Sequence, residues 1–150
     1  MLDIIYFSNV SGNTEKFVSK LDWKGKTHRI PIKGTCEFSL FNSYVLICPS
    51  YGEANHGHVP PQVRKFLSDP EYRSLCVGVI GSGSLNFGDE YALAGDMIAM
   101  KLQVPMFYKF DLAGNIEDVE KVKTGLLKFG QAGKHEFHRN NPNNVEAAKV

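Results

Sequence analysis

A segment rich in hydroxyl, amide and glycine residues follows the first apolar run of the chain. It consists of Ser8, Asn9, Val10, Ser11, Gly12, Asn13 and Thr14. If a helix begins at its end, unpaired backbone N–H groups and polar side chains converge there, and the helix dipole favours an anion. The segment lacks the Lys of the Walker pattern, so a terminal monophosphate is the favoured ligand. An ordinary capped turn uses the same residue types, and the segment alone leaves both interpretations open.

Two later segments each carry an aromatic residue among glycine and small polar residues. Residues 49–58 contain the candidates Ser50, Tyr51, Gly52, Glu53 and Asn55, and residues 81–88 contain Gly83, Ser84, Asn86, Phe87 and Gly88. Tyr51 and Phe87 could form two walls of a slot for a flat ring, with backbone groups and Asn86 at its polar edge. Taken with the first segment, this pattern favours a planar ring that carries a monophosphate, and flavin mononucleotide (FMN) has that form.

The apolar pattern predicts the strands that would bring these segments together. Near-continuous apolar runs over residues 4–7, 44–48 and 75–80 predict strands that are covered on both faces, as in a parallel sheet. Residues 26–32 and 106–112 alternate instead, which is typical of edge strands with one partly solvated face. The sequence therefore predicts an α/β fold with a doubly wound five-stranded parallel sheet of order 2-1-3-4-5. The three polar segments would meet at its switch point, beyond the carboxyl ends of the strands.

Helical periodicity predicts helices over residues 14–21, 59–68, 89–102 and 115–129. Asn115 is expected to cap the last helix, and its apolar positions should be buried: Ile116, Val119, Val122 and Leu126. The composition turns polar after this helix. We therefore expect one doubly wound domain over residues 1–130 and a flexible polar tail over residues 131–150.

Composition excludes several classes of protein. The 150 residues include 17 Lys and Arg against 16 Asp and Glu, a net charge of +1 that argues against nucleic-acid binding and against a disordered acidic chain. No apolar run approaches the roughly 20 residues that span a membrane. The N-terminus lacks the pattern of a targeting segment. The three cysteines include no C-x-x-C pair, and Cys48 and Cys76 are expected to be buried in strands, so we expect a cytoplasmic protein.

Other patterns that could carry chemistry are weak. His56 with His58, and His135 with His138, have no evident third partner for a metal ion. No G-x-S-x-G elbow is present, so hydrolase chemistry has no support. The sequence therefore predicts neither a metal site nor a catalytic side chain.

A combination of short motifs resembles the NrdI family, the flavodoxin-like proteins that serve class Ib ribonucleotide reductase. The resemblance covers roughly residues 4–129 and leaves out the tail. The motifs include Tyr6-Phe7-Ser8, Ser11-Gly12-Asn13-Thr14, Pro49-Ser50-Tyr51-Gly52, Asn86-Phe87-Gly88, Ala94-Gly95-Asp96 and Lys109-Phe110-Asp111-Leu112.

This resemblance implies an FMN protein whose chemistry occurs at the flavin. The reduced flavin would convert dioxygen to superoxide, which would oxidise the dimanganese centre of the small reductase subunit so that a tyrosyl radical forms. Such a protein is an activating redox partner rather than a stand-alone enzyme, and it needs a flavin reductant that the sequence does not identify. Residues 8–14 would hold the phosphate, Tyr51 and Phe87 would flank the ring, and residues 50–55 and 83–88 would meet its edges. Ser84 departs from the family, which usually has Asn there.

Two alternatives stay open. A flavodoxin-type one-electron shuttle would surround the flavin with carboxylates, whereas the three segments contain only Glu53, with Asp89 just beyond. A flavin-free binding module could use residues 8–14 for another phosphate, in which case the purified protein would be colourless and would not take up FMN.

Overall fold

The computed structural model describes residues 1–39, 42–50, 59–84 and 91–132. Five parallel strands form one sheet in the order β2-β1-β3-β4-β5, which confirms the predicted fold class and strand order. The strands are β1 (Asp3–Phe7), β2 (Thr27–Ile30), β3 (Tyr44–Pro49), β4 (Cys76–Gly83) and β5 (Met106–Asp111). Every residue of β3 is buried, whereas the edge strands β2 and β5 are partly exposed, as their alternating sequences predict.

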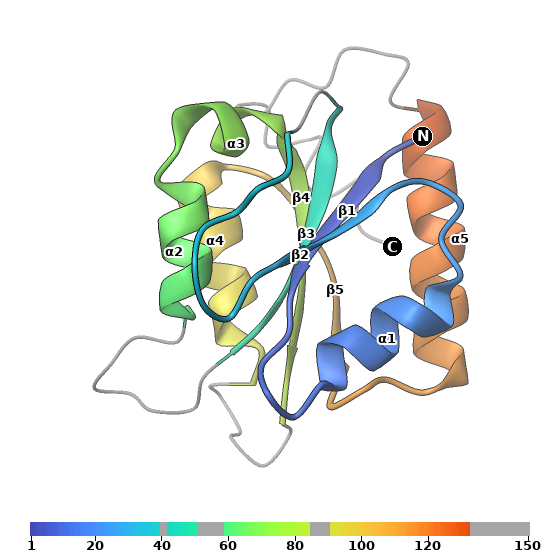
Figure 1. Cartoon of the computed structure of the whole chain (residues 1–150). Helices are drawn as coiled ribbons and strands as arrows, with labels where there is room; N and C mark the ends of the chain where they lie inside the picture. Colours follow the sequence, from blue (N-terminus) through green and yellow to red (C-terminus); the bar gives the residue numbers. More distant parts are fainter. Residues whose placement is uncertain (40–41, 51–58, 85–90, 133–150) are drawn as a thin grey trace.

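Helices cover both faces of the sheet (Figure 1). They are α1 (Asn13–Leu21), α2 (Pro61–Leu67), α3 (Pro70–Leu75), α4 (Leu93–Leu102) and α5 (Ile116–Ala132). Helices α1 and α5 lie on one face, and α2, α3 and α4 lie on the other. Within the described ranges, none of these helices has the length and apolar character needed to span a membrane.

Each face of the sheet has its own apolar core. On the α1/α5 face, Phe17 stacks on Phe110 with ring centroids 3.8 Å apart, and Val122 and Leu126 of α5 are buried. On the opposite face, Phe66 of α2 packs among side chains of β3 and α4. Because an apolar core packs against each face of the sheet, the strands are held in place, and so are the carboxyl ends of β1, β3 and β4.

Strand β4 differs from its prediction. It begins at Cys76 and continues through Gly81, Ser82 and Gly83, which the sequence analysis assigned to a loop. Glycine and serine are typical of loops, but here all three residues pair with β5, and Gly81 and Ser82 also pair with β3. Glycine at 81 also permits the close approach of α4, because an added Cβ would lie 3.1 Å from the carbonyl oxygen of Ala92.

Strand β5 contains an irregularity that changes its alternation. Val79 of β4 lies opposite Met106, whereas the next residue, Ile80, lies opposite Tyr108. Phe107 is therefore an extra residue, as in a β-bulge. Phe107 and Phe110 are consequently both buried in the α1/α5 core, although strict alternation places them on opposite faces.

The predicted helices differ from the structure in several ways, and Val119, which was expected to be buried, is half-buried. Helix α3 was missed, although Asp69 and Pro70 form a typical start, and the Asp69 carboxylate accepts a hydrogen bond from the Glu71 amide at 2.9 Å. Helix α4 begins at Leu93 rather than Asp89, because Ala92 adopts a left-handed conformation with φ of +53°. Ile116 is 79% exposed and not buried, since it lies at the first position of α5, beyond the edge of the core.

The two ends of α5 bear on the predicted cap and domain boundary. The Asp118 amide donates to the Asn115 side chain at 2.8 Å and the Asn115 amide donates to the Asp118 carboxylate at 2.9 Å, which confirms the predicted cap. The helix ends at Ala132, past the predicted end at Phe129. The rest of the predicted tail lies outside the described residues.

Candidate functional site

The segment from Ser8 to Thr14, hereafter the anion loop, joins the carboxyl end of β1 to the N-terminus of α1. The Gly12 amide donates to the Asn9 carbonyl oxygen at 3.0 Å, and the Ser11 amide donates to the Asn9 side-chain oxygen at 3.0 Å. Gly12 has a φ of +74°, and no atom of the described residues lies within 4 Å of the place where a Cβ would stand. The loop therefore turns tightly and leaves open space at the start of the helix.

Two amides at the start of α1 are available to a ligand. The Glu15 amide donates to the Ser8 hydroxyl oxygen at 3.1 Å, and the Lys16 amide donates to the Gly12 carbonyl oxygen at 2.9 Å. The amides of Asn13 and Thr14 have no acceptor among the described residues. Free amides at a helix N-terminus form a site for a phosphate or another anion.

Ser82 of β4 contacts the anion loop and is itself hydrogen-bonded to Ser50, which directly follows β3. The buried Thr14 hydroxyl approaches the buried Ser82 hydroxyl, with the two oxygens 3.4 Å apart. The Ser50 amide donates to the Ser82 carbonyl oxygen at 2.9 Å, and the Ser50 hydroxyl accepts from the Ala94 amide at 3.3 Å. Two predicted site residues, Thr14 and Ser50, thus both contact Ser82, close to the carboxyl ends of the strands. Ser82 was missed because its Gly-Ser-Gly context looked like part of a loop.

The end of β4 joins this region to β5. The Leu112 amide donates to the Gly83 carbonyl oxygen at 2.8 Å. A Cβ at Gly83 would lie 3.0 Å from the backbone nitrogen of Ala92, so the strand and the start of α4 are in close contact. Ser84 follows and is half-buried. Val10 of the anion loop, by contrast, is 92% exposed, so its side chain points away from the protein.

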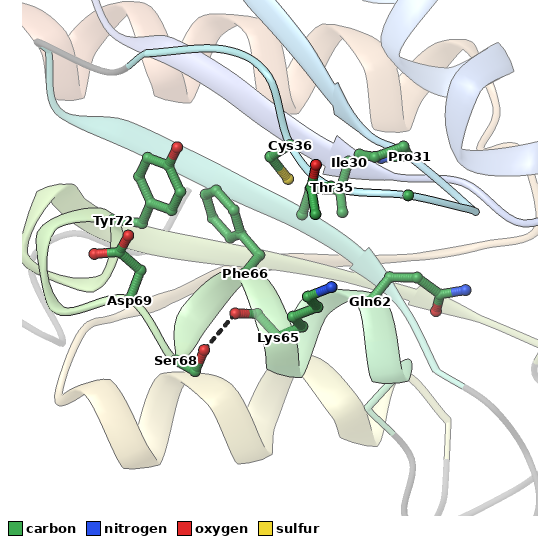
Figure 2. Close-up of a pocket in the computed structure, with 11 residues that line it drawn as sticks. Ile30, Pro31, Thr35, Cys36, Gln62, Lys65, Phe66, Ser68, Asp69 and Tyr72 are labelled. Carbon is green, nitrogen blue, oxygen red and sulfur yellow. Dashed lines mark hydrogen bonds between the residues drawn. The ribbon is translucent and has the colours of Figure 1, made fainter.

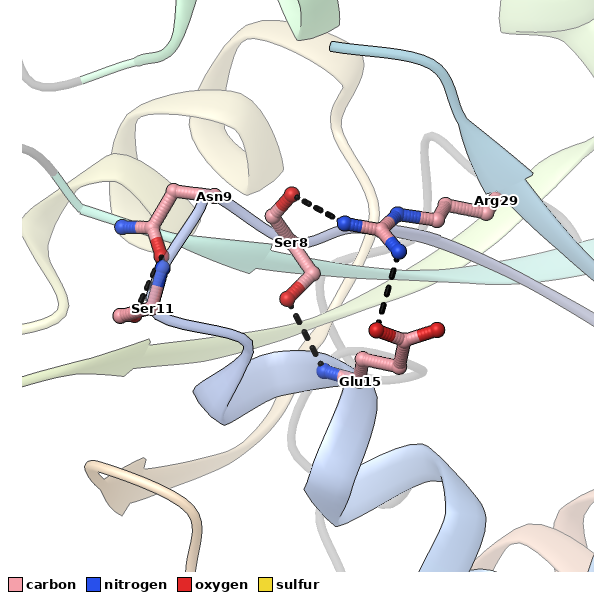
Figure 3. A network of polar contacts seen from close by, with 5 residues as sticks. All are labelled: Ser8, Asn9, Ser11, Glu15 and Arg29. Atoms are coloured by element: carbon pink, nitrogen blue, oxygen red, sulfur yellow. Dashed lines mark hydrogen bonds and ion pairs between the residues drawn. The ribbon is translucent and has the colours of Figure 1, made fainter.

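Arg29 is a further residue at the anion loop that the sequence analysis missed (Figure 3). Its guanidinium group donates to the Ser8 carbonyl oxygen at 3.1 Å and forms an ion pair with the Glu15 carboxylate at 2.9 Å. The loop has no cationic residue of its own, and the neighbouring strand β2 brings one to it. No local sequence pattern links Arg29 to residues 8–15, so only the sheet order could have revealed the contact.

The remaining predicted site residues lie outside the described part of the chain. These are Tyr51, Gly52, Glu53, Asn55, Asn86, Phe87 and Gly88. Their assignment to the ring-binding slot stays a prediction. The predicted phosphate contacts of residues 8–14 also stay a prediction, although the geometry of their amides suits that ligand.

A separate pocket of about 330 Å³ lies between α2, α3 and the segment after β2 (Figure 2). Phe66 and Tyr72 line it together with the half-buried Cys36. Burial raises the pKa of the Cys36 thiol, and the nearby Lys65 partly opposes that change. None of the residues lining this pocket belongs to the predicted site.

The described residues give little support to metal or thiol chemistry. No group of three or more His, Cys, Asp or Glu residues within the described ranges is arranged to hold a metal ion. Cys48 and Cys76 are buried in β3 and β4, as predicted, and burial raises the pKa of the Cys48 thiol. A buried neutral thiol is a poor nucleophile. The chemistry that the described site suits is the binding of an anion.

The strand order and an anion loop at the switch point define a flavodoxin-like protein. Solved structures with this fold include a short-chain flavodoxin associated with a bacterial microcompartment, with a TM-score of 0.60 at 20% identity, covering 88% of this chain and 99% of that one. A flavodoxin from Streptococcus pneumoniae gives 0.55 at 22% identity, covering 90% of this chain and 100% of that one.

The chain belongs to the NrdI flavodoxin-like family, whose family model matches residues 5–124. The NrdI protein of Mycoplasma genitalium is 46% identical over 131 residues, which are 85% of this chain and 84% of that protein. The NrdI protein of Yersinia enterocolitica is 48% identical over 133 residues, which are 87% of this chain and 98% of that protein. Membership confirms the family resemblance and implies a flavin ligand.

Proposed function

We propose that this chain binds FMN and supports class Ib ribonucleotide reductase by supplying superoxide for assembly of the dimanganese-tyrosyl radical cofactor. Membership in the NrdI family is the observation that carries the proposal. The anion loop supports it, because the unpaired amides of Asn13 and Thr14 suit a terminal phosphate better than a neutral group.

The described residues of the anion loop fit the phosphate of the cofactor. The anion loop would hold the phosphate through the Asn13 and Thr14 amides, with open space above Gly12 for its oxygens. The ends of β3 and β4, at Ser50 and Gly83, would lie beside the ring system. When bound and reduced, FMN supplies one electron to dioxygen and so forms superoxide. The chain's own part is to bind, orient and shield the cofactor.

The direct test measures tyrosyl radical formation in a manganese-loaded small reductase subunit by electron paramagnetic resonance. The mixture contains this protein, FMN, a chemical reductant and dioxygen, and the matched reaction omits only this protein. We expect radical formation to depend on the protein and to fall when superoxide dismutase is added. Equal radical yields with and without the protein would refute the proposed function.

The flavin part of the proposal has a simpler test. Purified protein should be yellow or should take up added FMN, with a shifted absorption spectrum and quenched flavin fluorescence. A colourless protein that binds neither FMN nor riboflavin would instead favour a flavin-free binding module.

A further inference from the structure

Arg29, Ser8 and Glu15 form a closed set of polar contacts around the anion loop (Figure 3). The Arg29 guanidinium group spans the other two residues, since it donates to the Ser8 carbonyl oxygen at 3.1 Å and to the Glu15 carboxylate at 2.9 Å. The Glu15 amide closes the set by donating to the Ser8 hydroxyl oxygen at 3.1 Å. The guanidinium group is thereby fixed to the first residue of the loop and to the first turn of α1.

The charges of Arg29 and Glu15 matter because the anion loop has no charged side chain of its own. Residues 8–14 contain no Lys or Arg, so the potential that they supply comes from backbone and hydroxyl dipoles. The Arg29 and Glu15 side chains are only 33% and 46% exposed, and solvent therefore screens them incompletely. Glu15 alone would repel an anion bound at the start of α1, whereas Arg29 alone would attract it.

Tyr6 is the neighbouring titratable group on β1, opposite Arg29 in the sheet. Burial raises the pKa of its phenol, Glu15 raises it further and Arg29 opposes the change. The phenol is therefore neutral near pH 7 and adds no charge to the pair. In the described contacts of the anion loop, the charged side chains are therefore those of Arg29 and Glu15.

We infer that Arg29 is a specificity residue for the phosphate group, and that Glu15 limits its effect. Arg29 offsets the Glu15 carboxylate at the start of α1, so that the site keeps its preference for a phosphorylated flavin over its unphosphorylated form. This inference rests on the proposed flavin function. It concerns how strongly the site discriminates FMN from riboflavin, which share the ring and differ in the phosphate.

The test compares dissociation constants for FMN and riboflavin, measured by flavin fluorescence, in the whole protein and its variants. The ratio of the two constants isolates the phosphate. In Arg29→Gln the preference for FMN should fall about tenfold, and in Glu15→Gln it should rise several-fold, as expected for one partly screened charge. The riboflavin constant should change less than about twofold in both variants. These differences should shrink in 0.5 M KCl, because salt screens exposed charges.

Two further variants separate charge from position. The double variant Arg29→Gln/Glu15→Gln restores neutrality and should return the preference close to that of the wild type. Arg29→Lys loses the two-pronged geometry of the guanidinium group but keeps its charge. Because the charge is kept, this variant should retain most of the preference for FMN. If Arg29→Lys behaves like Arg29→Gln and the double variant does not recover, Arg29 acts by holding the loop in place, and the inference is wrong.

Other outcomes are equally decisive. An unchanged ratio in Arg29→Gln and Glu15→Gln, or an equal loss of both ligands, would overturn the inference. If the wild type binds neither flavin, the proposed function fails instead. Inorganic phosphate, titrated while the amide resonances of Asn13 and Thr14 are followed by NMR, then tests Arg29 independently. Weaker phosphate binding in Arg29→Gln would uphold its role at the anion loop, and unchanged binding would refute it.

Discussion

Gly12 and Gly34 adopt the same kind of backbone conformation in different surroundings. Their φ angles are +74° and +89°, and in the described part of the chain no atom lies within 4 Å of a Cβ added at either position. Gly12 lies in the anion loop, whereas Gly34 lies in the segment after β2. A substitution at either position is therefore strained in the backbone without any steric clash, which makes the two glycines a matched pair.

Gly12→Ala should lower both the stability of the protein and its affinity for FMN. A left-handed conformation costs a non-glycine residue about 1–2 kcal/mol, so urea unfolding should show a loss of that size. FMN affinity should also fall, because the added methyl group occupies open space where the phosphate would bind. Gly34→Ala is the control and should lose stability to a similar extent with unchanged FMN affinity. Equal FMN affinities in the two variants would contradict a phosphate site at Gly12.

Tyr108 should make stability depend on pH in alkaline solution. Burial, followed by the hydrogen bond that the phenol donates to Asp118 at 2.6 Å, raises the pKa of Tyr108 to about 12. An unfolded chain has a tyrosine pKa of about 10. The folded state therefore keeps a proton that the unfolded state loses, and the free energy of unfolding is largest below pH 10 and falls towards pH 12.

Tyr108→Phe removes this titration and should reduce the alkaline slope. The measurement is the free energy of unfolding in urea at several pH values between about 9 and 12, with the variant beside the wild type. Some slope should remain, because burial, followed by Asp111, raises the pKa of Tyr91 to about 12 as well. Identical slopes for the two proteins would show that Tyr108 does not hold its proton more tightly when folded.

The sequence predicted the parts of the site that depend on local chemistry. The polar residues of 8–14 after a buried strand indicated an anion loop, and Asn115 indicated a helix cap that the structure confirms. Arg29 and Ser82 could not be predicted in this way, because their contacts with Ser8, Glu15 and Thr14 join a strand to another element far away in the sequence. The apolar patterns predicted the sheet order, but such contacts also depend on strand register and side-chain conformation, which those patterns do not encode.

At the scale of elements, the match between prediction and structure depends on how clearly each end is marked. The buried strands β1 and β3 were predicted closely, because continuous apolar runs are hard to place anywhere but a covered sheet. The end of β4 was misplaced because glycine there serves the packing of α4 rather than a turn. Ile116 was misassigned because helical periodicity defines a face but does not show where the core ends along the helix.

The contact between α4 and β4 gives a prediction at this scale. A Cβ at Gly95 would lie 2.6 Å from the terminal methyl group of Met106 and 3.0 Å from the Cα of Gly81. The Met106 side chain can move, but the backbone of β4 cannot do so without disturbing the sheet. Gly95→Ala should therefore lower the free energy of unfolding by about 1–3 kcal/mol, although alanine favours the helix itself.

Gly130 of α5 is the control for this substitution. Among the described residues, a Cβ there would meet only the Cγ of Leu2 at 3.9 Å, which is ordinary contact. Gly130→Ala should therefore leave stability unchanged or raise it by up to about 1 kcal/mol through helix propensity. Urea unfolding of both variants checks the pair. If Gly95→Ala proved as stable as Gly130→Ala, the close approach of α4 to β4 would be incorrect.

At the scale of the whole molecule, ion pairs between acidic and basic side chains reduce the negative charge that would act on a bound flavin. The chain has a net charge of +1. Several carboxylates of its described part are paired: Glu15 with Arg29, and Asp96 with Lys109, which joins α4 to β5. These pairings leave fewer uncompensated negative charges to act on a bound flavin than an acidic shuttle would provide.

The redox potentials of bound FMN should therefore separate the proposed oxygen-activating function from a one-electron shuttle. A single charge about 8 Å from the flavin, at an effective dielectric constant near 20, contributes on the order of 2 kcal/mol, or roughly 90 mV for one electron. Several uncompensated carboxylates would make the second one-electron reduction very unfavourable. We expect the potential of this second reduction to lie close to the value for free FMN, with little accumulation of the one-electron form during a spectroscopic redox titration.

Arg29→Gln leaves Glu15 unpaired and should lower the potential of the second reduction, whereas Glu15→Gln should raise it. A very low second potential in the wild type, together with a dominant one-electron form, would favour the shuttle, because it would show that the carboxylates act on the flavin despite their partners.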